Sequence, residues 1–283
     1  MVLWTVTMGL AAALPPEAMA ELSRWRAEKD AEMRGPFSPL SREPARRLAP
    51  DHNVLGSGPS DALRFDRPGV PASCVDFVVE GGRVEVVPLM PVVEVDGAPA
   101  TAGPLRWGGR VGVGPLTLVL VGGPSAPQLS VNDASLPSML AYRGLHYLPI
   151  DGRYRVAATF EPADTGRTLT LETSTGGRRL LPLRGKLHFR LAGRDLALDA
   201  FEMGDRPDDL FVIFKDATNG QETYGTGRFL WVNRPAGGKT VVDFNFAWNP
   251  LCAYSHAFSC PLAPPENRLP APIPVGEGTY PSP

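Results

Sequence analysis

Polar side chains with hydrogen-bonding chemistry concentrate in the last third of the sequence. The segment TVVDFNFAWN, residues 240–249, alternates apolar residues with Asp243, Asn245 and Asn249. Successive side chains of a strand face opposite sides, so this spacing predicts one apolar and one polar face. Because Asp and Asn are poor strand formers, we expect the polar face to have a hydrogen-bonding task rather than simple contact with water.

A second polar segment, DATNGQETYGTGRF, brings Asp216, Tyr224 and Arg228 around an Asn-Gly turn. Arg228 has the geometry for a bidentate pair with Asp216 or Asp243. Two interpretations stay open. The pair belongs to a buried ion-pair network that locks a barrel end, or Arg228 binds an anionic or carbonyl group in a pocket where Tyr224 and Trp248 supply flat apolar contact.

The three cysteines carry weaker signals. Cys252, His256 and Cys260 have C-x3-H-x3-C spacing, which is not the spacing of a zinc knuckle and lacks a fourth ligand. A Cys/His nucleophile pair would need an orienting third group that the sequence does not identify. We therefore assign no metal ligand, and expect Cys252 and Cys260 to form a disulfide in an exported protein or to pack as small apolar groups otherwise. Cys74 lies in a strand pattern and is expected in the core.

The sequence from residue 140 onward predicts a scaffold of strands for these residues. Short apolar runs recur with tight turns between them. The expected strands are 154–160, 168–173, 187–191, 196–202, 210–216, 228–232 and 240–246, with a hairpin at Ala192–Asp195. This regularity favours an antiparallel β-barrel or curved sandwich over residues 140–283. The proline-rich chain after Asn249 can be ordered only by packing along another surface.

The first half predicts a smaller β-sandwich over residues 50–124, with a domain boundary in the irregular segment 122–140. Its strand order, with LGSGPSDALRF at the start, resembles a forkhead-associated domain. Ser57 follows Gly56 where that family has its phosphate-binding arginine, and an anion site without its bidentate cation loses most of its energy. The resemblance therefore implies a similar shape and no phosphothreonine site.

The N-terminal end has two interpretations. Residues 1–15 are an apolar segment of signal-peptide length, followed by Ala18-Met19-Ala20, which resembles a cleavage site. No Lys or Arg precedes the apolar run, and residues 16–34 predict a helix that would contain this site. We favour the helix and a cytoplasmic protein, with export as the alternative. The apolar run is too short for a transmembrane span.

Composition supports an all-β fold and excludes some partners. The 283 residues include 30 Gly and 31 Pro, and long helical patterns are scarce. Lys and Arg number 28 against 30 Asp and Glu, so no sustained field attracts nucleic acid or anionic lipid. We expect no cofactor.

Longer motifs resemble a known family. The runs FKDATNGQETYGTGRFL and VVDFNFAWNPLCAY, a second cysteine in SCPLAPPENRLP and a closing GEG are similar to the bacterial and archaeal family catalogued as domain of unknown function 1684. YRGLHYLPIDGRYRV resembles that family's central segment, and ELSRWRAEKDAEMR its leading helix. Leu251 departs from the family's second proline, and GPFSPLSREPARRL replaces its usual GWLSL-like stretch. The resemblance implies an all-β, two-part protein and no particular activity.

By this resemblance a set of residues falls on the family's motif positions: Asp216, Tyr224, Arg228, Asp243, Asn245, Asn249, Cys252, Cys260, Asn267 and Arg268. We predict that the eight residues other than cysteine form a ligand-binding site.

Three functions are compatible with this sequence, and whether the protein is an enzyme stays open. The first is a non-enzymatic binding or interaction module, with a polar pocket roofed by residues 249–270 and a small molecule or a protein as partner. The second is a hydrolase-like enzyme in which Asp243 or Glu222 acts as a base beside His256. The third is a structural subunit whose proline-rich tail wraps a partner.

Overall fold

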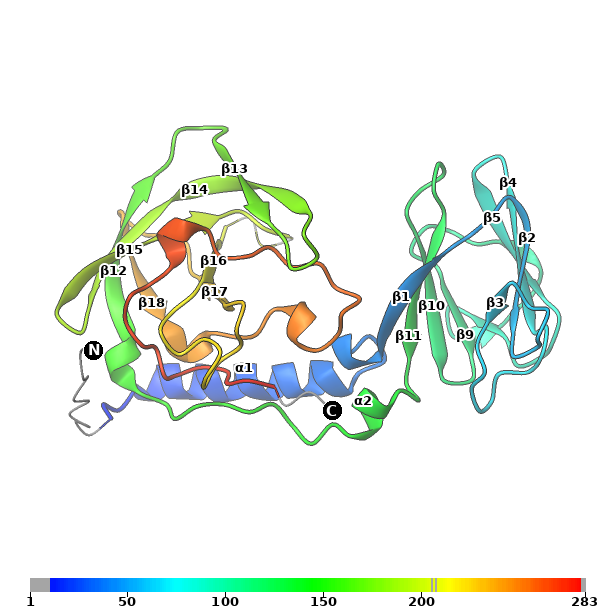
Figure 1. Cartoon of the computed structure of the whole chain (residues 1–283), viewed down its shortest axis with the longest axis horizontal. Coiled ribbons are helices and arrows are strands. Elements are labelled where there is room, and N and C mark those ends of the chain that lie inside the picture. The colour runs from blue at the N-terminus through cyan, green and yellow to red at the C-terminus, as the bar shows by residue number, and fades with distance from the viewer. Residues whose placement is uncertain (1–10, 205, 207, 281–283) are drawn as a thin grey trace. The chain divides into compact units, whose positions relative to one another are not determined.

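The computed structural model describes residues 11–204, 206 and 208–280. Contacts divide the chain into two compact units, residues 30–143, here called the sandwich unit, and residues 1–29 with 144–282, here called the barrel unit. The predicted all-β class is confirmed, with a helix near the N-terminus and antiparallel sheets in both units (Figure 1). The predicted apolar segment 1–15 lies largely outside the described residues.

The sandwich unit contains two sheets around one apolar core. The first sheet has the spatial order β1 (Arg42–Arg47), β11 (Gln128–Asp133), β10 (Leu116–Val121), β9 (Arg110–Val113), β6 (Glu94–Val95) and β7 (Ala98–Pro99). The second has the order β3 (Leu63–Arg64), β2 (Asp51–Gly56), β4 (Val75–Glu80), β5 (Arg83–Pro88) and β8 (Gly103–Pro104). Leu55 and Phe77 of the second sheet share a core cluster with Leu118 and Leu129 of the first. Buried Cys74 belongs to the same cluster.

Two strands of this unit lie outside the range predicted for the sandwich. β1 and β11 pair with each other, and β11 falls in the segment that the sequence predicts to be irregular. The glycines and prolines that flank β11 mask its short alternating pattern, QLSVND. The predicted domain boundaries stay a prediction.

The barrel unit is built on one curled sheet that forms a half-barrel (Figure 1). Its spatial order is β17 (Arg228–Val232), β16 (Leu210–Phe214), β15 (Arg194–Phe201), β14 (Arg178–Leu191), β12 (Arg155–Pro162) and β18 (Lys239–Asp243), with β13 (Thr168–Glu172) paired to β14. The long strand β14 bends at Gly185, where a Cβ would lie 2.2 Å from the carbonyl oxygen of Glu161. The predicted hairpin between β14 and β15 is confirmed, with positive φ at Ala192 and Gly193.

The last predicted strand, 240–246, is three residues too long. β18 ends at Asp243, whose carboxylate accepts a hydrogen bond from the backbone N–H of Asn245 at 3.0 Å. That bond caps a 3-10 helix over Phe244–Phe246. An aspartate that binds its own backbone two residues later favours a turn over a strand, so the expected alternation of faces stops here.

Helix α1 (Pro16–Arg34) contributes its residues 16–29 to the barrel unit. Ala18 and Leu22 are buried there and pack with Phe246 and Ile150. The sequence predicts the same helical range, and the Ala18-Met19-Ala20 site lies inside it. Among the described residues no helix is both long enough and apolar enough to cross a membrane.

The chain after Asn249 packs along the barrel unit itself. Isolated bridges connect Pro261 to Thr173, Arg268 to Lys215 and Glu277 to Tyr147. Ile273 and Val275 join the barrel core cluster. The proline-rich tail is therefore ordered by its own domain, since its backbone finds there the partners that polyproline-like chain cannot supply internally.

Candidate functional site

Arg228 lies in the interior of the barrel unit. Its side chain is fully buried, and its Nη2 donates to Asp216 Oδ2 and to the carbonyl oxygen of Ile273, both at 2.8 Å. Nη1 donates to the carbonyl oxygen of Val275. Burial lowers the pKa of Arg228, and the negative charge of Asp216 opposes that shift. Arg228 therefore pairs with Asp216 through one nitrogen rather than in the predicted bidentate form, and its bonds to Ile273 and Val275 anchor the C-terminal tail in the core.

Asn245 and Asn267 also bind backbone groups of the barrel unit. Asn245 exchanges two hydrogen bonds with the backbone of Asp151, at 2.9 and 3.0 Å, and its Nδ2 donates to Asp243 Oδ1 at 2.8 Å. Asn267 accepts from the N–H of Asp199 at 2.6 Å and donates to the carbonyl oxygens of Asp199 and Ile213. Each amide therefore joins two chain segments that are distant in sequence.

Asn249 completes a third buried group with Glu277. The backbone N–H and Nδ2 of Asn249 donate to the Glu277 carboxylate at 3.0 and 2.8 Å, and the hydroxyl of Tyr254 donates to the same group. Burial raises the pKa of Glu277 to about 7. The GEG motif does not reveal this role in the sequence, because a carboxylate between two glycines gives no sign of its burial.

Tyr224 and the two C-terminal cysteines, Cys252 and Cys260, form a small cluster. The hydroxyl of Tyr224 donates to the carbonyl oxygen of Cys252 at 3.2 Å, and the backbone N–H of Cys252 donates to Cys260 Sγ at 3.3 Å. Burial raises the pKa of Tyr224 to about 12. A hydrogen bond from the Cys260 thiol lowers the pKa of Cys252 to about 6, and the same interaction raises that of Cys260. Both thiols are buried and free, and their disulfide stays a prediction.

Most of the eight predicted ligand residues are buried in these hydrogen-bonded groups, while Tyr224 lies in the cysteine cluster and Arg268 at the surface. Arg268 is exposed and lines a shallow depression of about 230 Å³ with Lys215. Asp216 and Arg228 are buried against each other, and the buried side chains of Asn245, Asn249 and Asn267 bind carboxylates or backbone groups. Only Asp243 of the predicted set lines the larger cleft described next.

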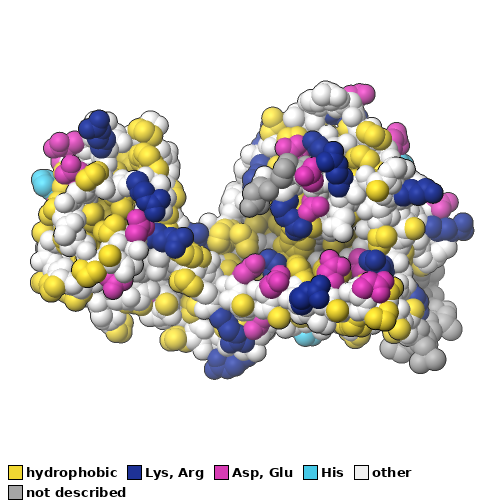
Figure 2. Space-filling model, turned by 180° about the vertical axis from the view of Figure 1, so that it is seen from behind, with side chains coloured by type: hydrophobic (Ala, Val, Ile, Leu, Met, Phe, Trp, Pro, Cys, Tyr) yellow, Lys and Arg dark blue, Asp and Glu magenta, His cyan; other side chains and the backbone are white. Residues whose placement is uncertain are grey.

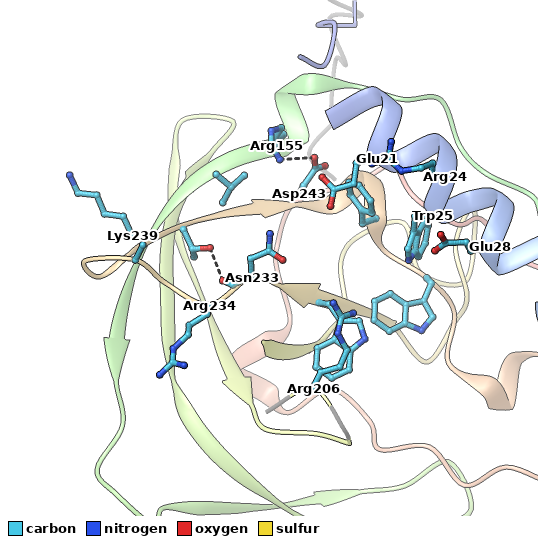
Figure 3. A pocket seen from close by; sticks show the side chains of 16 residues that line it. Glu21, Arg24, Trp25, Glu28, Arg155, Arg206, Asn233, Arg234, Lys239 and Asp243 are labelled. Carbon is cyan, nitrogen blue, oxygen red and sulfur yellow. Dashed lines mark hydrogen bonds and ion pairs between the residues drawn. The ribbon is translucent and has the colours of Figure 1, made fainter. Parts of the chain in front are cut away.

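That cleft lies where the half-barrel stays open. β17 and β18 are the two ends of the sheet, so in the described chain no ladder joins them. Phe229 of β17 and Trp248, which follows β18 in the chain, exchange backbone hydrogen bonds at 2.9 and 3.0 Å. The cleft encloses about 520 Å³ and is lined by residues of α1, β12, β17 and β18 (Figure 3). This volume is in the range of small-molecule sites.

Aromatic rings form the apolar part of the cleft. Trp231 and Trp248 lie with an interplanar angle of 25° and ring centroids 6.4 Å apart. Trp25 of α1 contacts Phe246 at 5.5 Å and Trp248 at 6.3 Å between centroids. All four rings are half-buried. Figure 2 shows a hollow in this unit, with apolar side chains inside it and side chains of both charge signs around it.

Charged side chains of both signs line the walls. The cations are Arg24, Arg155, Arg206, Arg234 and Lys239, and the carboxylates are Glu21, Glu28 and Asp243. Arg155 donates to Asp243 at 3.1 Å, and Arg206 pairs with Asp209 at 2.6 Å while lying 5.0 Å from the Trp231 ring centroid. Figure 3 shows Arg234 and Lys239 pointing away from the middle of the cleft.

The hydrolase constellation is not assembled in the described chain. His256 and Glu222 are exposed on their loops, and neither lines the cleft with Asp243. The described residues also contain no group of three or more His, Cys, Asp and Glu side chains arranged to hold a metal ion.

Most residues of the cleft are not among the predicted site residues. Two sequence patterns nevertheless correspond to its walls. Glu21, Trp25 and Glu28 share one face of a helix at i, i+4 and i+7, and Trp231 alternates with buried neighbours on β17. Neither pattern shows from sequence that the two faces meet.

Comparison with known proteins gives a family and no activity. Residues 140–278 match the family described as Protein of unknown function (DUF1684). The chain is 37% identical to the uncharacterized protein from gene locus rrnAC0354 of Haloarcula marismortui, known from a solution NMR structure, over 51% of this chain and 81% of that one, with a TM-score of 0.43. No curated protein matches the chain.

Two structures of FHA domains are also similar to part of the chain. One is the FhaA FHA domain complexed with the intracellular domain of Rv3910, at 16% identity over 31% of this chain and 97% of that one, with a TM-score of 0.24. The other comes from a study of phosphothreonine-dependent FHA domain interactions, at 16% identity over 32% and 96%, with a TM-score of 0.24. On the family match and the archaeal relative, the chain belongs, through residues 140–278, to the family described as Protein of unknown function (DUF1684).

Proposed function

We propose that this chain is a non-enzymatic binding module that holds a small molecule in the cleft between α1, β17 and β18. One observation supports the proposal above the others. Three half-buried tryptophans, Trp25, Trp231 and Trp248, converge in a cleft of about 520 Å³ whose rim carries polar side chains. Ligand sites typically combine an apolar, aromatic lining with a few polar groups that fix orientation.

Half-buried indoles in a concave site offer apolar area that a ligand would remove from water. An aromatic side chain buries on the order of 150–250 Å² when it is fully covered. Trp231 packs against Phe211, Trp248 packs against Phe229, and each indole stays partly exposed. The uncovered part is therefore a source of binding free energy at about 25 cal/mol per Å².

The buried hydrogen bonds of Asn245 and Asn249 support the same site. Asn245 and Asn249 flank the segment that carries Phe246 and Trp248, and both side chains are fully buried and hydrogen-bonded. Binding groups work best on elements whose geometry is fixed by packing and hydrogen bonds around them. The residues first predicted to touch a ligand would on this proposal position those that do.

Asp243 has a positioning role in the proposed site. Its Oδ1 accepts from the N–H and Nδ2 of Asn245, and its Oδ2 accepts from Arg155. It thereby holds Arg155, which is 31% exposed and keeps further N–H donors available to a ligand in the cleft.

The test is native mass spectrometry of the protein purified from its native host. We expect a bound small molecule that disappears on collisional activation. Trp231→Ala should lose it, while Trp107→Ala, which removes a 40% exposed indole from the sandwich unit, should keep it. Retention of the molecule by Trp231→Ala, or its loss from Trp107→Ala, would refute the placement of the site.

A further inference from the structure

The walls of the cleft offer both hydrogen-bond acceptors and hydrogen-bond donors. Glu21 and Glu28 project from the face of α1 that carries Trp25, and within the described chain neither has an ion-pair partner. On the strand side, the Arg206 guanidinium lies over the Trp231 ring and is fixed by Asp209. The side chain of Asn233, which is exposed, adds an amide with both donor and acceptor atoms.

This mixture of charges is unfavourable for a ligand of either sign. An anion bound near Arg206 and Arg155 would lie in the same cleft as the carboxylates of Glu21 and Glu28. A cation near those carboxylates would meet the two guanidinium groups. A ligand rich in hydroxyl groups avoids both penalties, because each hydroxyl donates one hydrogen bond and accepts others.

Two stacked indoles supply much of the apolar part of the proposed site. Trp231 and Trp248 are within 25° of parallel, with centroids 6.4 Å apart. Both line the cleft, so together they offer a ligand more apolar area than one ring would. A pyranose ring has an apolar C–H face, with its hydroxyl groups directed outward toward the surrounding side chains.

From these features we infer that the ligand of the cleft is a neutral carbohydrate. The inference deepens the proposed binding function and rests on it. Trp231 and Trp248 would pack against the C–H face of a sugar ring, Glu28 would accept from its hydroxyl groups, and Arg206 and Asn233 would donate to them.

The experiment is an array of neutral and acidic glycans probed with the full, fluorescently labelled chain at 50 and 500 mM NaCl. We expect binding to neutral glycans that does not change with salt, because screening acts only between charges. Glu28→Gln and Asn233→Ala alter exposed side chains and should leave the fold intact. Each should weaken binding roughly three- to tenfold, the loss of about one hydrogen bond. Glu85→Gln, the same exchange at an exposed position of β5, should leave binding unchanged.

Charged probes separate failure of the carbohydrate inference from failure of the binding function. Tetramethylammonium and benzoate are titrated against the tryptophan fluorescence of the same protein. If either binds in the cleft while no neutral glycan does, the carbohydrate inference is wrong and the binding function stands. The same conclusion follows if only acidic glycans bind and salt weakens them. If no glycan and no charged probe binds, and native mass spectrometry finds no retained molecule, both are wrong.

Discussion

Replacing Arg228 with methionine tests whether the buried network is a structural support. The guanidinium is fully buried, and it donates to Asp216, Ile273 and Val275. Asp216 Oδ1 keeps three donors, from Thr218 N, Thr218 Oγ1 and Ile273 N, after the exchange. Asp216 Oδ2 loses its one described donor, so Arg228→Met leaves a buried carboxylate without its countercharge.

The expected loss of stability follows from these contacts. Breaking a buried ion pair by removing one partner costs about 3–5 kcal/mol, and each orphaned buried carbonyl adds up to about 1–3 kcal/mol. Because such terms are not additive, we expect Arg228→Met to lower the free energy of unfolding of the barrel unit by about 4 kcal/mol or more. This is a large part of the roughly 5–15 kcal/mol that stabilises a typical protein.

Urea unfolding followed by circular dichroism and tryptophan fluorescence measures this loss. Arg184→Met is the matched control, since its pair with Glu202 is about 40% exposed on both sides and should contribute less than about 1 kcal/mol. The double variant Arg228→Met/Asp216→Asn removes the uncompensated charge and should recover part of the loss. A loss below about 1 kcal/mol in Arg228→Met would refute the structural role, and would return Arg228 to the set of ligand-binding candidates.

Other buried contacts of the barrel unit can be tested by pH, oxidation and glycine replacement. Burial raises the pKa of Glu277 from 4.5 to about 7, so the protonated form of this side chain favours the folded state. Its contribution to the free energy of unfolding is complete below pH 4.5 and is lost as pH rises through about 7. The whole contribution is about 3 kcal/mol. The stability difference between wild type and Glu277→Gln, measured by urea unfolding from pH 4.5 to 8, should therefore change by that amount, and a pH-independent difference would contradict it. Oxidation of Cys252 and Cys260 by a small-molecule disulfide should give an intramolecular disulfide that closes the loop between them, seen as two fewer reactive thiols and a peptide cross-link after proteolysis. The two residues are neighbours, since the backbone nitrogen of Cys252 lies 3.3 Å from Cys260 Sγ, and a cross-link from either residue to Cys74 would contradict this prediction. Gly185→Ala should destabilise the barrel unit by more than about 1 kcal/mol, because the added Cβ would lie 2.2 Å from the Glu161 carbonyl oxygen. Gly166→Ala is the control, since its Cβ would have no atom within 4 Å, and it should lose less stability in the same urea titration.

The elements that sequence predicted well are those with strong local signals. The hairpin at Ala192 and Gly193 follows from a Gly-containing turn between two alternating runs. The helix over 16–34 begins at prolines and ends at Gly35. The first half of β14 was missed because Pro182 and Gly185 interrupt its pattern, and the partner strands that stabilise it lie elsewhere in the chain.

The polar segment 240–249 shows which features of a site cannot be predicted from residue types. Sequence predicted a hydrogen-bonding task for Asn245 and Asn249, and the structure places both in buried hydrogen bonds. Asn267, which entered through the family resemblance, is buried and hydrogen-bonded as well. Many of their partners are backbone carbonyls and N–H groups, which every residue carries, so no pairing could be predicted. The cleft depends on the meeting of α1 with β17 and β18, a long-range packing event that local patterns do not encode.

The most direct measurement of the central claim is a two-dimensional NMR spectrum of the indole N–H groups during addition of a ligand. The ligand is the small-molecule fraction released by denaturing the protein purified from its native host. We predict that the indole signals of Trp25, Trp231 and Trp248 shift together and saturate, while that of Trp107 stays in place. Unchanged signals from the three cleft tryptophans, or a shift confined to Trp107, would contradict the account.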